Sequence, residues 1–71
     1  MASYEEKAAL TARELECLAG LADGLKNHDI AGRLQIAEPT VAMHLANAKR
    51  KLGAATREQA VAIAVRNGLL K

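Results

Sequence analysis

The stretch from Asn27 to Leu52 constrains this chain most, because it contains two helical patterns separated by a tight turn. The first pattern places three apolar residues inward: Ile30, Ala31 and Leu34. After the turn at residues 35–37, the second pattern places one apolar stripe at the spacing i, i+4, i+7, i+11: Val41, Leu45, Ala48 and Leu52. A helix with that spacing buries only one face. Ala31 is small, as two helices crossing at a tight turn require. We therefore predict a helix-turn-helix whose second helix leaves one face free to enter a DNA major groove.

The composition predicts a single small domain with a thin core. The chain has 71 residues, of which 51% are hydrophobic but only 1% aromatic. Leu, Ile, Val and Ala must therefore form the core. A domain of this size buries only about 60% of its unfolded surface. Marginal stability follows, and with it a reason to oligomerise.

The net charge of +2 is unevenly distributed along the chain. Residues 1–38 contain seven acidic and four basic side chains, a net charge of −3. Residues 39–71 contain six basic side chains and one acidic side chain, a net charge of +5. The second helix of the motif therefore lies in the basic half, as phosphate binding requires.

Several classes of function are not supported by any pattern in the sequence. Cys17 is the single cysteine, so we expect no intramolecular disulfide and a reducing, cytoplasmic location. The chain has only two histidines, His28 and His44, and together with Cys17 they do not make a metal site. We find no nucleophile triad, paired carboxylates or glycine-rich phosphate loop, and so predict no enzyme and no cofactor. No long apolar run predicts a membrane span, and residues 1–9 are expected to be a flexible N-terminal arm rather than a signal peptide.

The first helix is predicted to begin after Thr11, which forms a capping box with Glu14. Leu10 and Leu15 are placed to form a hydrophobic staple across this start. The helix should run to about Asp23 and stop at Gly24. Its predicted buried stripe consists of Leu15, Leu18 and Ala22, with Cys17 and Leu21 beside it. Gly20, inside the helix, indicates either close packing or a weak point, at about 1 kcal/mol relative to alanine.

The remaining helix ends follow from capping residues. Asn27 is predicted to cap the second helix, and Pro39 suits the first turn of the third. The third helix is expected over about 38–52 and ends at Gly53. Thr56 and Gln59 predict another capping box, which opens a fourth helix over about 57–67. Gly68 should then terminate that helix.

The run from Ala60 to Val65 is apolar in every direction around the fourth helix, although a helix in a small core needs only one apolar face. Half of the run is alanine, which is tolerated anywhere. We favour a second interpretation, in which Ala62, Val65 and Leu69 form an apolar stripe for a partner. Arg66 lies next to that stripe.

With these features in place, the sequence resembles the LuxR/GerE-type helix-turn-helix family of bacterial transcription regulators. The resemblance covers residues 10–70 and lies in register across the four predicted helices. The matching residues are Leu10-Thr11, Arg13-Glu14, Leu18, Gly24, Asn27, Ile30-Ala31, Leu34, Thr40-Val41, His44, Asn47, Lys51-Leu52-Gly53, Ala60-Val61, Ala64 and Gly68-Leu69.

The resemblance implies an all-α, four-helix LuxR/GerE-type domain over residues 10–71 that regulates transcription. Its third helix would contact double-stranded DNA, and its fourth would form a twofold homodimer on a palindromic site. Contact with RNA polymerase is also implied. The sequence departs from the family pattern at Gly20 and at the cap position Ala37. It departs most at Ala42 and Ala46, where polar residues often reach bases or phosphates.

Projection of the third helix with its apolar stripe inward leaves Met43, Ala46, Asn47 and Arg50 outward, with Ala42 at the edge. Met43 and Asn47 are the predicted base contacts, because asparagine can bond adenine bidentately and methionine offers an apolar surface. A basic run and a hydroxyl are the predicted phosphate contacts: Lys49, Arg50, Lys51 and Thr40. Thr40 could equally serve as an ordinary capping residue. His44 flanks the buried stripe, so a structural role is at least as well supported as a phosphate contact.

One alternative function belongs to a different class. Alanine at positions 42 and 46 cannot hydrogen-bond a base edge, whereas the fourth helix is rich in apolar residues. The domain could therefore be an interaction module that pairs with other LuxR-type regulators and inhibits them.

Overall fold

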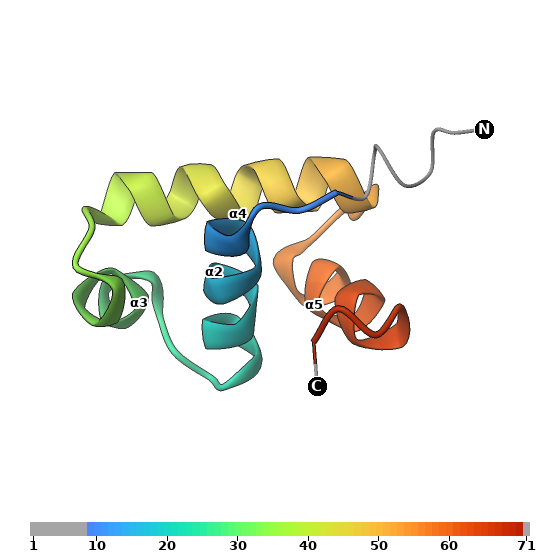
Figure 1. Cartoon of the computed structure of the whole chain (residues 1–71), viewed down its shortest axis with the longest axis horizontal. Coiled ribbons are helices and arrows are strands. Elements are labelled where there is room, and N and C mark those ends of the chain that lie inside the picture. Colours follow the sequence, from blue (N-terminus) through green and yellow to red (C-terminus); the bar gives the residue numbers. More distant parts are fainter. Residues whose placement is uncertain (1–8, 71) are drawn as a thin grey trace.

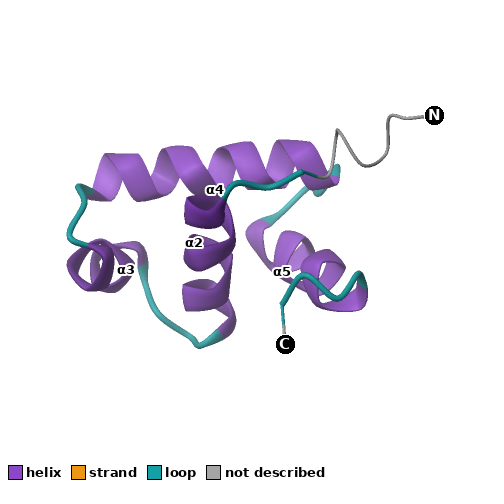
Figure 2. Cartoon of the chain, viewed as in Figure 1, coloured by secondary structure: helices purple, strands orange, loops and turns teal. Residues whose placement is uncertain are grey.

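The computed structural model describes residues 9–70, and this part of the chain forms four α-helices and no strand. The helices are α2 (Ala12–Ala22), α3 (Asn27–Leu34), α4 (Glu38–Leu52) and α5 (Arg57–Arg66). The predicted all-α fold is confirmed over this range. Of the expected N-terminal arm, residues 1–8 lie outside the described residues. The longest helix, α4, lies along one edge, and α2, α3 and α5 pack on the same side of it (Figures 1 and 2).

The start of α2 is capped as the sequence predicts. The backbone N–H of Glu14 donates to Thr11 Oγ1 at 3.1 Å, and the N–H of Thr11 donates to Glu14 Oε1 at 3.0 Å. The predicted buried stripe is partly wrong, because Ala22 is exposed and Leu15 is only half-buried. The buried face is rotated toward Cys17 and Leu18, and one turn earlier it carries a charged residue, Glu14.

Close packing explains the glycine inside α2. A Cβ atom added at Gly20 would lie 2.7 Å from Ile30 Cγ1 and 3.0 Å from Ile30 Cδ1. The missing side chain therefore lets α3 approach α2, and the packing explanation of Gly20 is confirmed.

The prediction that Asn27 caps the second helix is wrong by one residue. Lys26 is the cap, and its N–H donates to Asp29 Oδ2 at 3.3 Å. Asn27 is the first residue of α3. At the other end, Gln35 adopts a left-handed conformation with φ 60°, which turns the chain toward α4. Ala37 precedes α4 without a side-chain cap, as its methyl group dictates.

The capping box predicted for α5 is only half present. The N–H of Gln59 donates to Thr56 Oγ1 at 3.0 Å. The Gln59 side chain, however, accepts from the N–H of Ala55 at 2.6 Å instead of from Thr56. The helix ends at Arg66, followed by Asn67 and by Gly68 at φ 75°.

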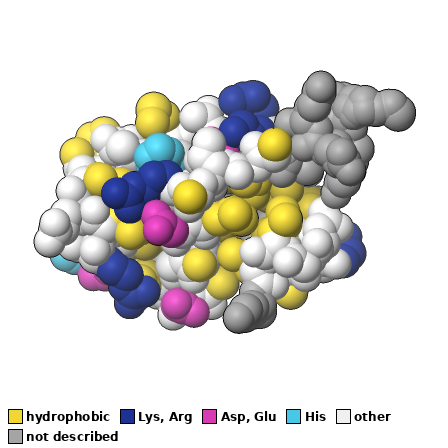
Figure 3. Space-filling view, viewed as in Figure 1, with side chains coloured by type: hydrophobic (Ala, Val, Ile, Leu, Met, Phe, Trp, Pro, Cys, Tyr) yellow, Lys and Arg dark blue, Asp and Glu magenta, His cyan; other side chains and the backbone are white. Residues whose placement is uncertain are grey.

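The core lies where α4 crosses the other three helices. It contains only aliphatic side chains and one thiol: Cys17, Leu18, Ile30, Ala31, Val41, Leu45, Ala48, Ala60 and Ala64. Half-buried leucines cover its edges, and hydrophobic side chains remain visible in the middle of one face (Figure 3). Burial raises the pKa of the Cys17 thiol, which behaves as a small core residue.

Candidate DNA-binding surface

The outward face of α4 is exposed along its length. Met43 keeps 51% of its surface exposed, and Ala42, Ala46 and Arg50 are also exposed. The opposite face places Val41, Leu45 and Ala48 in the core, with Leu52 half-buried against it. The predicted division of α4 into an inner and an outer face is therefore confirmed, except that Asn47, predicted to point outward, is half-buried.

Asn47 and Arg50 are hydrogen-bonded to each other on this outer face. Arg50 Nη2 donates to Asn47 Oδ1 at 3.2 Å, and the pair is exposed. A bidentate contact with adenine needs both the oxygen and the nitrogen of the Asn47 amide. The amide oxygen has two lone pairs, so it can accept from adenine beside Arg50, or Arg50 can release it at a cost of about 1 kcal/mol.

The basic run near the end of α4 does not form one surface. Lys51 Nζ lies 2.9 Å from Glu14 Oε1 and 3.1 Å from Glu14 Oε2. It also donates to the Ala9 carbonyl at 3.4 Å. The Lys51 ammonium is thus directed toward α2, whereas no ion-pair partner of Lys49 is present in residues 9–70. Of the three cations in this run, Lys51 is the one that pairs with a carboxylate within the fold.

Glu14 is the most buried charged residue of the described chain, with 3% of its surface exposed. Burial raises the pKa of the Glu14 carboxyl, but the Thr11 N–H and the Lys51 ammonium outweigh that effect. The pKa therefore lies below its ordinary value, and a charge on His44 lowers it further. His44 is half-buried on α4, and its role stays a prediction.

Thr40 is half-buried in the first turn of α4, and its hydroxyl does not cap the helix. In the range 9–70, no group of three or more His, Cys, Asp or Glu side chains is arranged to hold a metal ion. No helix of the described residues is long and apolar enough to cross a membrane.

The apolar stripe suggested by the sequence lies only partly on α5, because Leu69 follows the end of the helix at Arg66. Val65 is 46% exposed and Leu69 36%, while Ala62 and Arg66 are exposed beside them. Ala60 and Ala64 face the core instead. The helix therefore presents apolar groups on two sides, and only one of them is covered within the chain.

Two residues near the α4 face were not predicted as site residues. Asn27, at the start of α3, and Arg57, at the start of α5, line one hollow together with Ala42, Ala46 and Lys49. The only sequence signal for Arg57 is its place in the basic half, directly after the Thr56 cap.

Two helices joined at a short turn, the second with one buried face and one exposed face bearing cations, define the helix-turn-helix class of DNA-binding domains. Comparison with known proteins then identifies the family. Residues 8–64 match the model of bacterial regulatory proteins of the luxR family. The chain belongs to this family, as a DNA-binding domain of the transcription-regulator type.

Individual relatives agree with this assignment. The chain is 46% identical over 61 residues to the uncharacterized transcriptional regulatory protein YxjL of Bacillus subtilis, covering 86% of this chain and 28% of that protein. It is 44% identical over 64 residues to the transcriptional activator protein VanR of Vibrio anguillarum, covering 90% and 27% respectively. The solved structure of the transcription factor GerE matches with a TM-score of 0.84 and 39% identity, covering 87% of this chain and 92% of that one. The chain thus spans less than a third of the length of these two curated relatives.

Proposed function

We propose that this domain binds double-stranded DNA sequence-specifically, with α4 in the major groove. The observation that carries the proposal is the exposed outer face of α4, held rigidly by an inner face that is part of the core. A helix fixed in this way can enter a groove about 12 Å wide without local unfolding.

Within this proposal the outer face divides into two kinds of contact. Met43 and Asn47 contact base edges, and Ala42 and Ala46 can contact thymine methyl groups. Lys49 and Arg50 contact phosphates, and Thr40 does so from the first turn of α4. We leave Lys51 out of the phosphate contacts, because its ammonium is bound to Glu14. His44 is left out as well, because it is half-buried beside the inner stripe of α4.

We further propose that two copies pair through the outer face of α5. Val65 and Leu69 would form the centre of the contact, with Ala62 and Arg66 at its margin. Because a twofold dimer presents two identical helices, its site would be palindromic, with half-sites about one helical turn apart. For the whole protein we also propose contact with RNA polymerase and a cytoplasmic location, both of which the sequence leads us to expect.

The test is a binding measurement on two duplexes. One is selected from a random pool by the protein itself, and the other has a scrambled sequence of the same length. Specific binding predicts a large preference for the selected duplex at both about 50 mM and about 200 mM salt, whereas non-specific binding is lost over that range. If selection enriches no sequence, the proposed specificity is refuted.

A second candidate function rests on the exposed stripe of α5 and on the two alanines of α4. The domain would then pair with other regulators of the family and block them. In that case the selected and scrambled duplexes would be bound equally weakly, and pairing through α5 would persist without DNA.

A further inference from the structure

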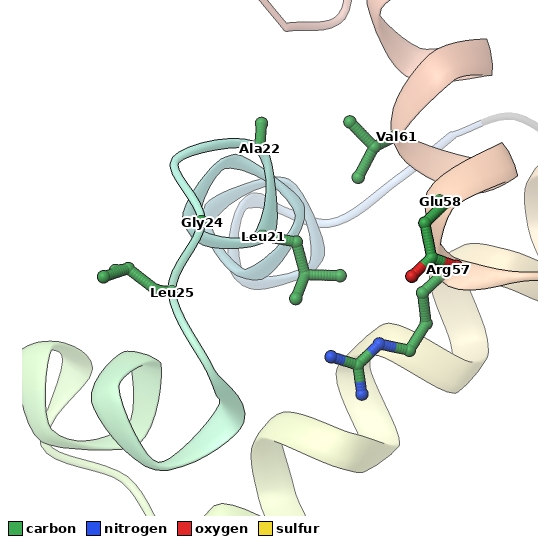
Figure 4. A pocket seen from close by; sticks show the side chains of 7 residues that line it. All are labelled: Leu21, Ala22, Gly24, Leu25, Arg57, Glu58 and Val61. Atoms are coloured by element: carbon green, nitrogen blue, oxygen red, sulfur yellow. The ribbon is translucent and has the colours of Figure 1, made fainter.

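Arg57 lies between two hollows on the surface of the domain. The larger, of about 370 Å³, is lined by residues of α2, of the turn that follows it and of α5, including Arg57 and the acidic Glu58. Figure 4 shows the Arg57 side chain leaving the start of α5 and extending toward the ribbon of α4. The smaller hollow, of about 150 Å³, lies on that α4 side and is lined by Asn27, Ala42, Leu45, Ala46, Lys49 and Arg57.

The smaller hollow is electrostatically suited to an anion. Two of its six lining residues are cationic and none is acidic. Neither Lys49 nor Arg57 makes an ion pair with any residue in the range 9–70. Two unpaired cations from separate helices therefore share one concave site. Its volume lies below the roughly 300–1,000 Å³ of small-molecule pockets, which favours a single small group.

The hollow lies directly beside the proposed base-contacting face. Ala42, Ala46 and Lys49 follow the spacing i, i+4, i+7 and form one stripe along α4. This stripe is displaced by one residue from the stripe of Met43, Asn47 and Arg50. A helix in the major groove has a sugar–phosphate strand along each side, so one strand would pass over the hollow.

The two alanines give the hollow its depth. A long side chain at either position would occupy the space between α4 and the start of α3. Asn27 contributes an unmatched polar group at this place, since its Oδ1 is buried and has no hydrogen-bond partner among residues 9–70. Arg57 lines the same hollow and carries five N–H donors, enough to serve both an asparagine oxygen and a phosphate.

We propose that this hollow binds one phosphate of the DNA backbone, held by Lys49 and Arg57 and admitted by Ala42 and Ala46. The inference rests on the proposed DNA-binding function and extends the contact surface from the helix-turn-helix to α5. It also gives the alanines a function: they remove hydrogen bonds to bases but allow close approach of the strand. Recognition then depends more on backbone position and groove shape.

The first test compares Arg57→Gln with Arg13→Gln on the selected and scrambled duplexes. Both changes remove one positive charge, but Arg13 lies outside the hollow and pairs with Glu16 on the surface of α2. Loss of one phosphate contact should lower the salt slope by about 0.9, so the ratio of Kd between 200 and 50 mM salt should fall about 3.5-fold. We expect this for Arg57→Gln on both duplexes and not for Arg13→Gln. Lys49→Gln should behave like Arg57→Gln.

The second test locates the phosphate. Duplexes that carry one uncharged methylphosphonate at successive positions should reveal a position where neutralisation weakens wild-type binding but not the binding of Arg57→Gln. Ala46→Leu, a change at an exposed position, should fill the hollow and weaken binding at that same phosphate. Circular dichroism of each variant checks that it is folded.

Two outcomes separate this inference from the function on which it rests. If wild type prefers its selected duplex while Arg57→Gln and Ala46→Leu keep the wild-type salt slope and methylphosphonate pattern, the phosphate site is refuted and the proposed function stands. If wild type shows no preference for any duplex, the proposed function fails, and the site as a part of specific recognition fails with it.

Discussion

Replacing Lys51 with methionine would leave the Glu14 carboxylate buried without its cation. Methionine keeps the apolar stem and is a good helix former, so the change isolates the ammonium. The lost contacts are those from Lys51 Nζ to the two Glu14 oxygens, at 2.9 and 3.1 Å. Among the described residues, the N–H of Thr11 alone would continue to donate to the carboxylate.

The expected loss of stability is large for so small a domain. Removing one partner of a buried ion pair costs about 3–5 kcal/mol. The Lys51 side chain is 23% exposed, so water screens part of the interaction and can solvate the remaining carboxylate. We therefore expect about 2–3 kcal/mol, from a total of about 5–15 kcal/mol for typical domains.

The difference in the free energy of unfolding between wild type and Lys51→Met should depend on pH in a defined direction. In wild type the pKa of Glu14 lies below its ordinary value, so its contribution to stability is present above that value. The contribution is lost as pH falls through the lower pKa of the folded state. Protonated Glu14 no longer needs the ammonium. The stability gap should therefore be full above about pH 5 and should narrow as the solution becomes more acidic.

Urea unfolding from about pH 7 to about pH 3 measures both effects. Lys49→Met is the matched control, because it removes a charge from the same last turn of α4 without breaking an ion pair. It should cost at most about 0.5 kcal/mol. In DNA binding, Lys49→Met should have the larger effect of the two. It should lower the salt slope, whereas Lys51→Met should leave the slope unchanged. The stabilising role of the Lys51–Glu14 ion pair would be refuted if Lys51→Met lowered the free energy of unfolding no more than Lys49→Met. It would also be refuted if the stability difference between wild type and Lys51→Met did not depend on pH.

Four further substitutions test three separate features. Gly20→Ala should lower the free energy of unfolding by about 1–3 kcal/mol, because its Cβ would lie 2.7 Å from Ile30 Cγ1. Gly32→Ala, with nothing within 4 Å, should raise it by about 0.5–1 kcal/mol, so equal signs in chemical denaturation would contradict the packing argument. Asn47→Ala should cost about 1–3 kcal/mol on the selected duplex and little on the scrambled one, and equal losses in anisotropy titrations would remove it from base contact. Val65→Glu should dissociate the proposed dimer without unfolding the chain, which sedimentation and circular dichroism can distinguish. A wild type that is monomeric at millimolar concentration, with and without DNA, would exclude the dimer.

Local signals in the sequence were sufficient for the helix-turn-helix itself. The predicted range 38–52 coincides with α4, because Pro39 marks its first turn and Gly53 its left-handed end. Thr11 and Glu14 likewise located the start of α2, because both partners of a capping box lie within one turn. Asn27 was misplaced because Asp29, acting from inside α3, caps the helix through the backbone of Lys26.

Contacts between distant residues could not be obtained in this way. Glu14 and Lys51 are 37 residues apart, and a charged side chain is ordinarily expected at the surface. The run Lys49-Arg50-Lys51 looks uniform in sequence, but successive residues point about 100° apart around a helix. One of its cations therefore faces the α5 side, one faces outward and one faces α2. The approach of Arg57 to Lys49 likewise depends on the turn between α4 and α5.

The alkylation rate of the buried Cys17 thiol measures how often the core of this domain opens. Alkylating reagents attack the thiolate, and Cys17 is fully inaccessible with its pKa raised by burial. Labelling must therefore wait until the core opens, and its rate reports the fraction of molecules that are open at any moment. A ligand that binds only the closed form slows this reaction in proportion to its occupancy. Mass spectrometry of Cys17 alkylation can thus follow the binding of DNA or of a second copy without any change to the amino-acid sequence.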